Sequence, residues 1–246
     1  MSPTTFLVSG TERGLGLGFV RQLAQRDNVL IFAGVIDPEH PDADEVKKVA
    51  EETGKVCVVK LVSASEEDAQ AVAALVKEKA GKLDYVIANA GIMTARVQTL
   101  ETPPEQLHKH FAVNTVGPYV LFQTFAPLLF ASPSPHFLAI SSTLGSMVLA
   151  GPSHPTVAYS MSKAALNMFV VKIAHEYGAK HNLAAYVLSP GWVATAQGNT
   201  SAMTFGGHPE HSIEEAVGKL LKVVDGATRE SAGGKFLQYT GEELPW

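Results

Sequence analysis

"TFLVSGTERGLGLG", residues 5–18, joins an apolar run to a glycine-rich turn. The centre of the run 5–10 is the apolar stretch Phe6-Leu7-Val8, which does not alternate with polar residues and so predicts a strand buried on both faces. Gly10, Gly14 and Gly16 allow the chain to turn tightly before a helix begins. Such a turn presents backbone N–H groups at a helix N-terminus, where an anion such as a pyrophosphate is favoured. The order strand, glycine turn, helix therefore predicts dinucleotide binding, although three glycines alone could also mark a plain tight connection.

The same alternation continues along the chain. Six further apolar runs predict strands over 29–34, 55–61, 84–90, 136–141, 184–189 and 235–239, and helical patterns separate them. We expect one helix to begin at Ser65 and stop at Gly81, a second to cover 104–130 with a bend at Gly117-Pro118, and a third to run from 157 to 177 with Gly178 as its stop. The stretches 145–156 and 194–212 are expected to be long loops. Strict alternation predicts one α/β domain over 1–246, a Rossmann-type doubly wound, seven-stranded, mostly parallel sheet with helices on both faces.

The composition narrows the class of protein. Among 246 residues the net charge is −5, which gives no reason to expect nucleic acid or an anionic membrane as a partner. Cys57 is the one cysteine, so no internal disulfide can form. The chain enters a strand at once, with no room for a signal peptide, and no apolar run is long enough to span a bilayer. We therefore expect a cytoplasmic protein.

Six motifs in order resemble the short-chain dehydrogenase/reductase family: "SGTERGLG", "ANAG", "VNTVGP", "ISSTLG", "YSMSK" and "PGWVAT". The ending "GKFLQYTGEELPW" resembles the branch of norsolorinic-acid-ketoreductase-like proteins and sniffer-type carbonyl reductases. The resemblance covers essentially the whole chain. It implies an oxidoreductase that transfers hydride between a nicotinamide dinucleotide and a carbonyl or alcohol.

The pair Tyr159 and Lys163 lies one helical turn apart and so shares a helix face. A phenol with a pKa near 10 is a poor acid–base group unless a nearby cation favours its charged form. We expect Lys163 to supply that charge, so that Tyr159 can donate a proton to a carbonyl oxygen. Taken by itself, the pair could equally be a half-buried tyrosine beside a surface lysine.

The resemblance assigns the remaining site residues. It implies that Ser142 hydrogen-bonds the substrate oxygen, that Asn114 holds a water in a relay from Lys163 to solvent, and that Lys163 binds the nicotinamide ribose. Ser141 is the structural alternative to Ser142, and Asn114 could also have a structural role alone. The residues expected around the cofactor, besides Tyr159 and Lys163, are Gly10, Thr11, Arg13, Gly14, Leu15, Gly16, Asn89, Ala90, Gly91, Pro190, Gly191, Val193 and Thr195.

The cofactor is expected to be NADPH/NADP. The acidic residue that NAD-specific relatives carry at the end of the second strand corresponds here to Gly34, with Asp37 a few residues further on. Arg13 lies before Gly14, where a guanidinium can pair with a 2′-phosphate. Two departures weaken this preference: Ile36 and Val62 stand where related reductases carry a basic residue and the adenine-binding aspartate.

The expected activity is reduction of a ketone by NADPH, with Tyr159 as general acid. The predicted loops carry apolar residues and no pair of basic residues, which points to a bulky neutral ketone of aromatic or polyketide-like character. The alternatives are an epimerase, dehydratase or cyclase step with the same cofactor, or a dinucleotide-binding protein without activity.

No metal site is expected, because His108 and His110 cannot face one ion from a helix. We expect 194–212 to act as a substrate lid. Surplus apolar residues predict a homodimer or homotetramer: Phe111, Phe122, Phe125, Met168, Phe169 and Ile173.

Overall fold

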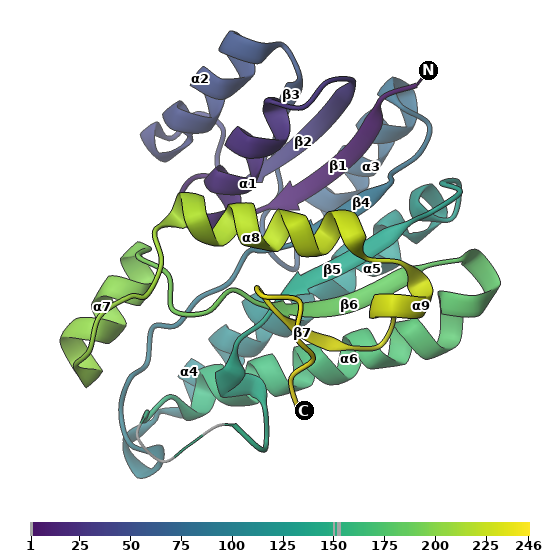
Figure 1. Cartoon of the computed structure of the whole chain (residues 1–246). Coiled ribbons are helices and arrows are strands. Elements are labelled where there is room, and N and C mark those ends of the chain that lie inside the picture. The colour runs from purple at the N-terminus through teal and green to yellow at the C-terminus, as the bar shows by residue number, and fades with distance from the viewer. Residues whose placement is uncertain (1, 150, 152–153) are drawn as a thin grey trace.

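Each of the seven apolar runs forms a strand of one parallel sheet (Figure 1). The computed structural model describes residues 2–149, 151 and 154–246. The sheet has the order β3-β2-β1-β4-β5-β6-β7, and every pairing between these strands is parallel. The predicted doubly wound sheet is confirmed. Its strands are β1 Thr4–Ser9, β2 Val29–Val35, β3 Val56–Lys60, β4 Tyr85–Ala88, β5 His136–Ile140, β6 Ala184–Ser189 and β7 Phe236–Gln238.

Helices cover both faces of the sheet, and each face has its own apolar core (Figure 1). One core includes residues of α1 (Gly14–Ala24), α2 (Asp44–Thr53) and α8 (Ile213–Gly226). The other includes residues of α3 (Glu66–Lys79), α5 (Gly117–Leu129) and α6 (Val157–His181). The strands are buried from both sides, which explains why they read as continuous rather than alternating apolar runs. No helix among the described residues is long and apolar enough to cross a membrane.

Several predicted helix boundaries are confirmed and one is wrong. The Ser65 side chain caps α3 by accepting a hydrogen bond from the Asp68 N–H, and Gly81 follows the helix with φ +71°. In contrast, α6 does not stop at Gly178 but continues to His181, and Asn182 ends it with φ 53°. Asparagine tolerates the left-handed conformation that a C-terminal cap requires, so the nearer glycine is not needed for it.

The predicted helix over 104–130 is divided in three. Pro104–Phe111 forms α4, Ala112–Val116 forms a π-helical turn (η3), and α5 begins at Gly117. The break therefore falls immediately before the expected Gly117-Pro118 bend. A π-turn inserts an extra residue into the helix and is common at functional sites, and this one carries Asn114.

The prediction of a long loop over 194–212 is wrong, because this stretch contains the helix α7 (Ala196–Phe205). The Thr195 hydroxyl caps α7 by accepting a hydrogen bond from the Gly198 N–H at 3.1 Å. None of the α7 residues is fully buried, so the helix has no apolar stripe that would reveal it in the sequence. Of the other expected loop, 145–156, residues 150, 152 and 153 lie outside the described residues, and Thr143–Gly145 forms a short 3₁₀ turn, η4.

The expected apolar surplus on two helices is largely core. Phe122, Phe125 and Ile173 are buried inside the subunit and need no second copy to cover them. The apolar side chains that α5, α6 and η3 do expose are Val116, Tyr119, Met161 and Met168.

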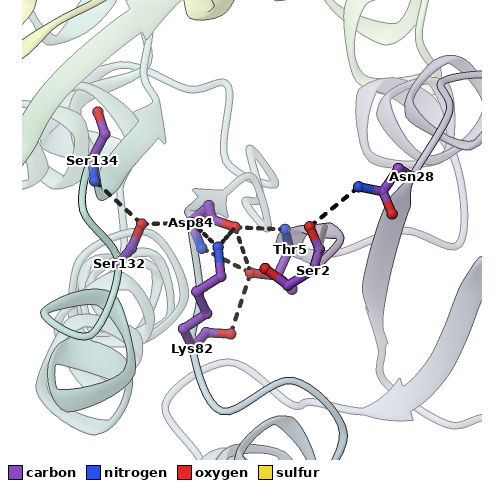
Figure 2. Close-up of polar contacts among 7 residues, drawn as sticks. All are labelled: Ser2, Thr5, Asn28, Lys82, Asp84, Ser132 and Ser134. Carbon is purple, nitrogen blue, oxygen red and sulfur yellow. Dashed lines mark hydrogen bonds and ion pairs between the residues drawn. The ribbon is translucent and has the colours of Figure 1, made fainter.

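A polar cluster forms around Asp84, the residue immediately before β4 (Figure 2). The Asp84 carboxylate accepts hydrogen bonds from the Thr5 N–H at 2.9 Å, the Thr5 hydroxyl at 3.0 Å, the Ser132 hydroxyl at 2.6 Å and the Lys82 ammonium at 2.7 Å. One carboxylate thus joins β1, β4 and the segment before β5.

Candidate active site

The glycine turn forms a close-fitting backbone cradle at the carboxyl end of β1. Gly10 and Gly14 have φ +68° and +59°, which side-chain-bearing residues rarely adopt. A Cβ on Gly10 would lie 2.9 Å from Ala90 Cα, and one on Gly16 would lie 1.9 Å from the Gly10 carbonyl oxygen. Because only glycine fits these positions, the backbone N–H groups at the start of α1 are left open to a ligand.

The end of β4 holds this cradle in shape. The Asn89 side-chain amide donates to the Ser9 carbonyl at 2.9 Å and to the Gly10 carbonyl at 3.0 Å. The Ser9 hydroxyl accepts from the N–H groups of Asn89 and Ala90, both at 3.1 Å. Thus the two motifs lie side by side, as expected, and Asn89 shapes the cradle by holding its backbone.

The end of β2, which lies beside the glycine turn, differs from the sequence-based prediction. The second strand ends at Val35 rather than Gly34, and Gly34 is paired inside the sheet. The Thr11 side chain is buried, and both its hydroxyl, at 3.1 Å, and its backbone N–H, at 3.0 Å, donate to the Gly34 carbonyl, so Thr11 fixes the turn to β2 and has no donor left for a ligand. Just beyond β2, the Ile36 N–H donates to the Glu12 carboxylate at 2.5 Å. Arg13 is exposed beside this carboxylate in the sequence and forms no ion pair with any described residue.

Tyr159 and Lys163 lie on one face of α6, both almost completely buried. The Lys163 ammonium donates to the Ile140 carbonyl at the end of β5 at 2.8 Å and lies 5.7 Å from the centre of the Tyr159 ring. A Cβ placed on Gly91 would lie 3.3 Å from the Lys163 ammonium, so this group faces the same open edge as the cradle. The predicted pair is therefore buried and directed to the carboxyl edge of the sheet.

The protonation of the pair differs from the sequence-based expectation. Burial raises the pKa of the Tyr159 phenol, and side-chain hydrogen bonding from Ser142 and Gln197 offsets only part of that rise. Burial lowers the pKa of Lys163 to about 8. The expectation that the pKa of Tyr159 lies below its ordinary value is wrong for this structure, because desolvation of the phenolate outweighs the hydrogen bonding from Ser142 and Gln197 and the charge of Arg96. Tyr159 consequently holds its proton at neutral pH.

The two serines after β5 have different surroundings. The Ser141 hydroxyl is buried and donates to the Asn167 side-chain oxygen at 2.7 Å. Ser142 is half-buried, and its hydroxyl accepts a hydrogen bond from the Leu144 N–H at 3.2 Å. The same hydroxyl hydrogen-bonds the Tyr159 hydroxyl. Of the two, Ser142 thus has the position suited to a substrate oxygen next to Tyr159.

Asn114 is completely buried, and its amide is used within the protein. Its Oδ1 accepts from the Ile92 N–H at 2.8 Å, while its Nδ2 donates to the Ile92 carbonyl at 2.9 Å and to the Ser162 hydroxyl at 3.0 Å. These contacts clamp the segment after β4 to α6. The structure therefore gives the Asn114 side chain a structural task beside Lys163.

The "PGWVAT" segment closes the other side of the site. Gly191 has φ +74°, and a Cβ there would lie 2.6 Å from the Tyr239 ring. Pro190 and Gly191 lead from β6 to Val193, which is buried and forms a parallel bridge with His211. A Cβ placed on Gly14 would lie 3.5 Å from the Thr195 Cγ2. Hence Thr195, at the start of α7, reaches the glycine turn.

Two residues near Tyr159 were not predicted from the sequence. The Gln197 side chain, on the first turn of α7, hydrogen-bonds the Tyr159 hydroxyl. Arg96, in the segment after β4, lowers the pKa of Tyr159 through its positive charge. The same segment is held by buried His110, whose Nε2 accepts from the Thr94 N–H at 3.2 Å and whose Nδ1 lies 2.6 Å from the Gln106 carbonyl. Because these residues lie far apart in the sequence, only the fold brings them together.

The residues fit a nicotinamide dinucleotide, since the cradle excludes side chains where a pyrophosphate would lie and leads directly to Tyr159 and Lys163.

Comparisons with known proteins identify the family of this chain. A short chain dehydrogenase family model matches residues 4–204. The chain is 31% identical over 250 residues to the short-chain dehydrogenase srdF of Neurospora crassa, covering 99% of this chain and 98% of that protein. It is 30% identical to the norsolorinic acid ketoreductase of Aspergillus parasiticus, covering 99% and 91%.

Solved structures give the same result. The NADPH-bound carbonyl reductase from chicken fatty liver superposes with a TM-score of 0.88 at 30% identity, covering 100% of both chains. Carbonyl reductase Sniffer of D. melanogaster shares the fold with a TM-score of 0.89 at 23% identity, covering 99% of this chain and 100% of that one. The order of the motifs, the parallel sheet and these matches lead to one conclusion: the chain belongs to the short-chain dehydrogenase family and is an oxidoreductase.

Proposed function

We propose that this protein is an NADPH-dependent carbonyl reductase that converts a ketone to an alcohol. One observation carries the proposal: the buried, protonated hydroxyl of Tyr159 lies beside the Ser142 hydroxyl, next to a glycine cradle, at the carboxyl edge of the sheet. In open α/β sheets this edge is where ligands bind. A hydroxyl that donates a proton and one that stabilises a developing oxyanion are the groups that ketone reduction requires.

The cofactor would be held by backbone at Gly10, Gly14, Leu15 and Gly16, with Ala90 and Gly91 opposite and Pro190, Gly191, Val193 and Thr195 at the nicotinamide end. When bound, it supplies the hydride that adds to the carbonyl carbon. Tyr159 Oη transfers its proton to the carbonyl oxygen, while the Ser142 hydroxyl donates a hydrogen bond to the same oxygen. The Lys163 ammonium would hold the ribose hydroxyls of the cofactor, and its charge stabilises the phenolate that Tyr159 becomes. A proton from solvent then restores Tyr159, which balances the reaction.

The substrate class is inferred from the relatives. The chicken relative is a carbonyl reductase and the fungal one a ketoreductase, which supports reduction of a bulky, aromatic or polyketide-like ketone, as in secondary metabolism. We place α7 and the rest of 194–212 over the substrate as a lid, because Gln197 on α7 already reaches Tyr159. Assembly as a homodimer or homotetramer through the apolar side chains exposed by η3, α5 and α6, and a cytoplasmic location, stay predictions.

A panel of ketones tests the proposal. Purified protein with NADPH should oxidise the cofactor, seen as loss of nicotinamide absorbance, in the presence of aromatic ketones and not in their absence. Tight NADPH binding with no turnover on any ketone would instead favour an epimerase, dehydratase or cyclase step, or a protein that only binds the dinucleotide.

Cofactor choice gives a separate prediction. Arg13 is exposed at the glycine turn with no acidic partner among the described residues, so its guanidinium is free to pair with a 2′-phosphate. One charge-assisted hydrogen bond should favour NADPH over NADH about tenfold or more. Arg13→Ala should remove most of this margin and leave NADH use nearly unchanged. The measurement is the dissociation constant and kcat/KM of each cofactor for both proteins.

Glu12 provides the matched variant. Its carboxylate accepts from the Ile36 N–H just beyond β2, at the corner where the adenosine ribose of a dinucleotide lies in this fold. A negative charge there repels a 2′-phosphate, so Glu12→Gln should raise the preference for NADPH. A wild-type protein that prefers NADH would contradict the assignment to Arg13 and point to Glu12 or Asp37 as the ribose-binding acid.

A further inference from the structure

Arg96 joins the segment after β4 to α7 across the proposed substrate site. Its Nη2 donates to the Gln197 carbonyl at 3.3 Å, and its Nε donates to the Ser201 hydroxyl at 3.4 Å. The Ser201 hydroxyl also contacts the Met93 sulfur at 3.7 Å. These contacts are long for hydrogen bonds to a guanidinium, so they hold the side chain in place without satisfying it.

The guanidinium lies within electrostatic reach of the reacting hydroxyl. The positive charge of Arg96 lowers the pKa of Tyr159, partly offsetting burial, and the ionised form of Tyr159 in turn raises the pKa of Arg96. Burial is the larger effect on Arg96 and lowers its pKa. Gln197, whose carbonyl Arg96 contacts, also reaches the Tyr159 hydroxyl with its side chain. Arg96 therefore lines the proposed substrate site.

Within the part of the chain that the structure describes, no acidic residue neutralises the charge of Arg96. Arg96 forms no ion pair within residues 2–149, 151 and 154–246, and both of its hydrogen-bond acceptors are neutral. The other titratable side chain whose pKa responds to Arg96 is His110, a base whose pKa the charge lowers. A guanidinium has five N–H donors, and the protein uses two of them. A half-buried cation with spare donors and no anion is incompletely paired.

We propose that Arg96 recognises an anionic oxygen substituent of the substrate, so that the preferred substrate is a ketone bearing a carboxylate or an ionised phenol or enol on the side that faces α7. This inference rests on the proposed ketone reduction, which places the carbonyl at Tyr159 and Ser142. It changes the sequence-based expectation of a neutral substrate. A neutral side chain could make the contacts to Gln197 and Ser201, and only an anionic ligand makes use of the charge.

Two pairs of ketones test the proposal. One pair is an aromatic keto acid and its methyl ester; the other is a hydroxylated aromatic ketone and its methyl ether, measured at pH values below and above the pKa of the phenol. For the wild type we expect kcat/KM to favour the anionic member of at least one pair by about ten- to a hundredfold. The carboxylate pair and the phenol pair show which anion is recognised.

Three variants separate recognition from structure. Arg96→Gln keeps amide donors for Gln197 and Ser201 but removes the charge. The ratio of kcat/KM for the anionic ketone to kcat/KM for its neutral partner should therefore fall to about one, and any effect of the lost charge on the pKa of Tyr159 acts on both ketones alike. Arg96→Lys keeps the charge and should retain part of the preference. Arg21→Gln, which removes a cation paired with Glu45 on the distant α1–α2 surface, should change nothing.

The outcomes are distinguishable. Equal losses with charged and neutral ketones in Arg96→Gln, or no preference in the wild type, would overturn the recognition of an anion and leave Arg96 as a structural contact to α7. A wild type that binds NADPH but reduces neither member of any pair would overturn the proposed function itself. In that case binding of the keto acid, followed by the fluorescence of Trp192, which donates to the Gly198 carbonyl of α7 at 3.0 Å, still tests Arg96: the acid should bind more tightly than its ester to the wild type and not to Arg96→Gln.

Discussion

Replacing Tyr159 with phenylalanine should lower kcat for ketone reduction by about 10²- to 10⁴-fold, the range typical of a positioned acid–base group. The substitution removes one oxygen atom from a fully buried ring and leaves the packing of α6 as it is. Because the phenol holds its proton in the folded protein, its loss removes the proton that the carbonyl oxygen must receive. The dissociation constant of NADPH should be nearly unchanged. Single-turnover rates and a cofactor titration measure the two quantities separately.

The chain offers a matched control for this substitution. Tyr186 is also completely buried, and its hydroxyl has no hydrogen-bond partner among the described residues. Tyr186→Phe therefore removes the same atom with no loss of a contact, and turnover should equal that of the wild type. A Tyr159→Phe protein that keeps wild-type turnover would refute the assignment of the general acid.

Asp84→Ala should lower the free energy of unfolding by about 3–5 kcal/mol, as expected when one partner of a buried charged network is removed. The Asp84 carboxylate accepts five hydrogen bonds from three residues (Figure 2), and the alanine leaves the buried Thr5 N–H and hydroxyl without this acceptor. Denaturant unfolding measures the change. Ser134→Ala should stay within about 0.5 kcal/mol of the wild type, because Ser134 contributes only its backbone N–H to this cluster. An Asp84→Ala protein as stable as the wild type would show that the network contributes nothing.

The same network makes stability depend on pH. Burial alone would raise the pKa of Asp84, but hydrogen bonds from Lys82, Ser132 and Thr5 outweigh it and lower the pKa below 3.8. A carboxylate with a lowered folded pKa stabilises the protein above its unfolded pKa and loses that contribution as the pH falls through the folded value. Burial also lowers the pKa of His136 to about 4, so its contribution is lost as the pH falls from about 6.5 towards 4. Asp84→Ala should thus flatten the acid limb below pH 4.

The sequence predicts the sheet well because the sheet depends on local signals. Each strand is a short apolar run between polar segments, and burial on both faces demands little more than that. The glycine turn was equally readable, since Gly10 and Gly16 are required by contacts within one strand–turn–helix unit and with Ala90 and Asn89. The fold and the position of the cofactor cradle therefore follow from residue order.

The substrate side of the site was harder to predict because it depends on tertiary contacts. Arg96 and Gln197 lie 101 positions apart, and neither belongs to a motif that indicates their meeting. The helix α7 has no buried side chain, so no periodicity marks it. The pKa of Tyr159 was predicted in the wrong direction for a related reason: the sequence shows the charges that stand near a phenol but not how completely the fold removes it from water.

The most direct test of the central claim follows one deuterium atom. NADPH carrying deuterium at one face of nicotinamide C4 is incubated with an aromatic ketone and the protein, and the alcohol is analysed by mass spectrometry. The experiment is run twice, with the deuterium on either face of C4. Ketone reduction predicts one deuterium on the carbinol carbon from one of these two labelled cofactors and none from the other. Tyr159→Phe should reduce the product yield at least a hundredfold. Bound NADPH that keeps its deuterium while every ketone is recovered unchanged would contradict the account.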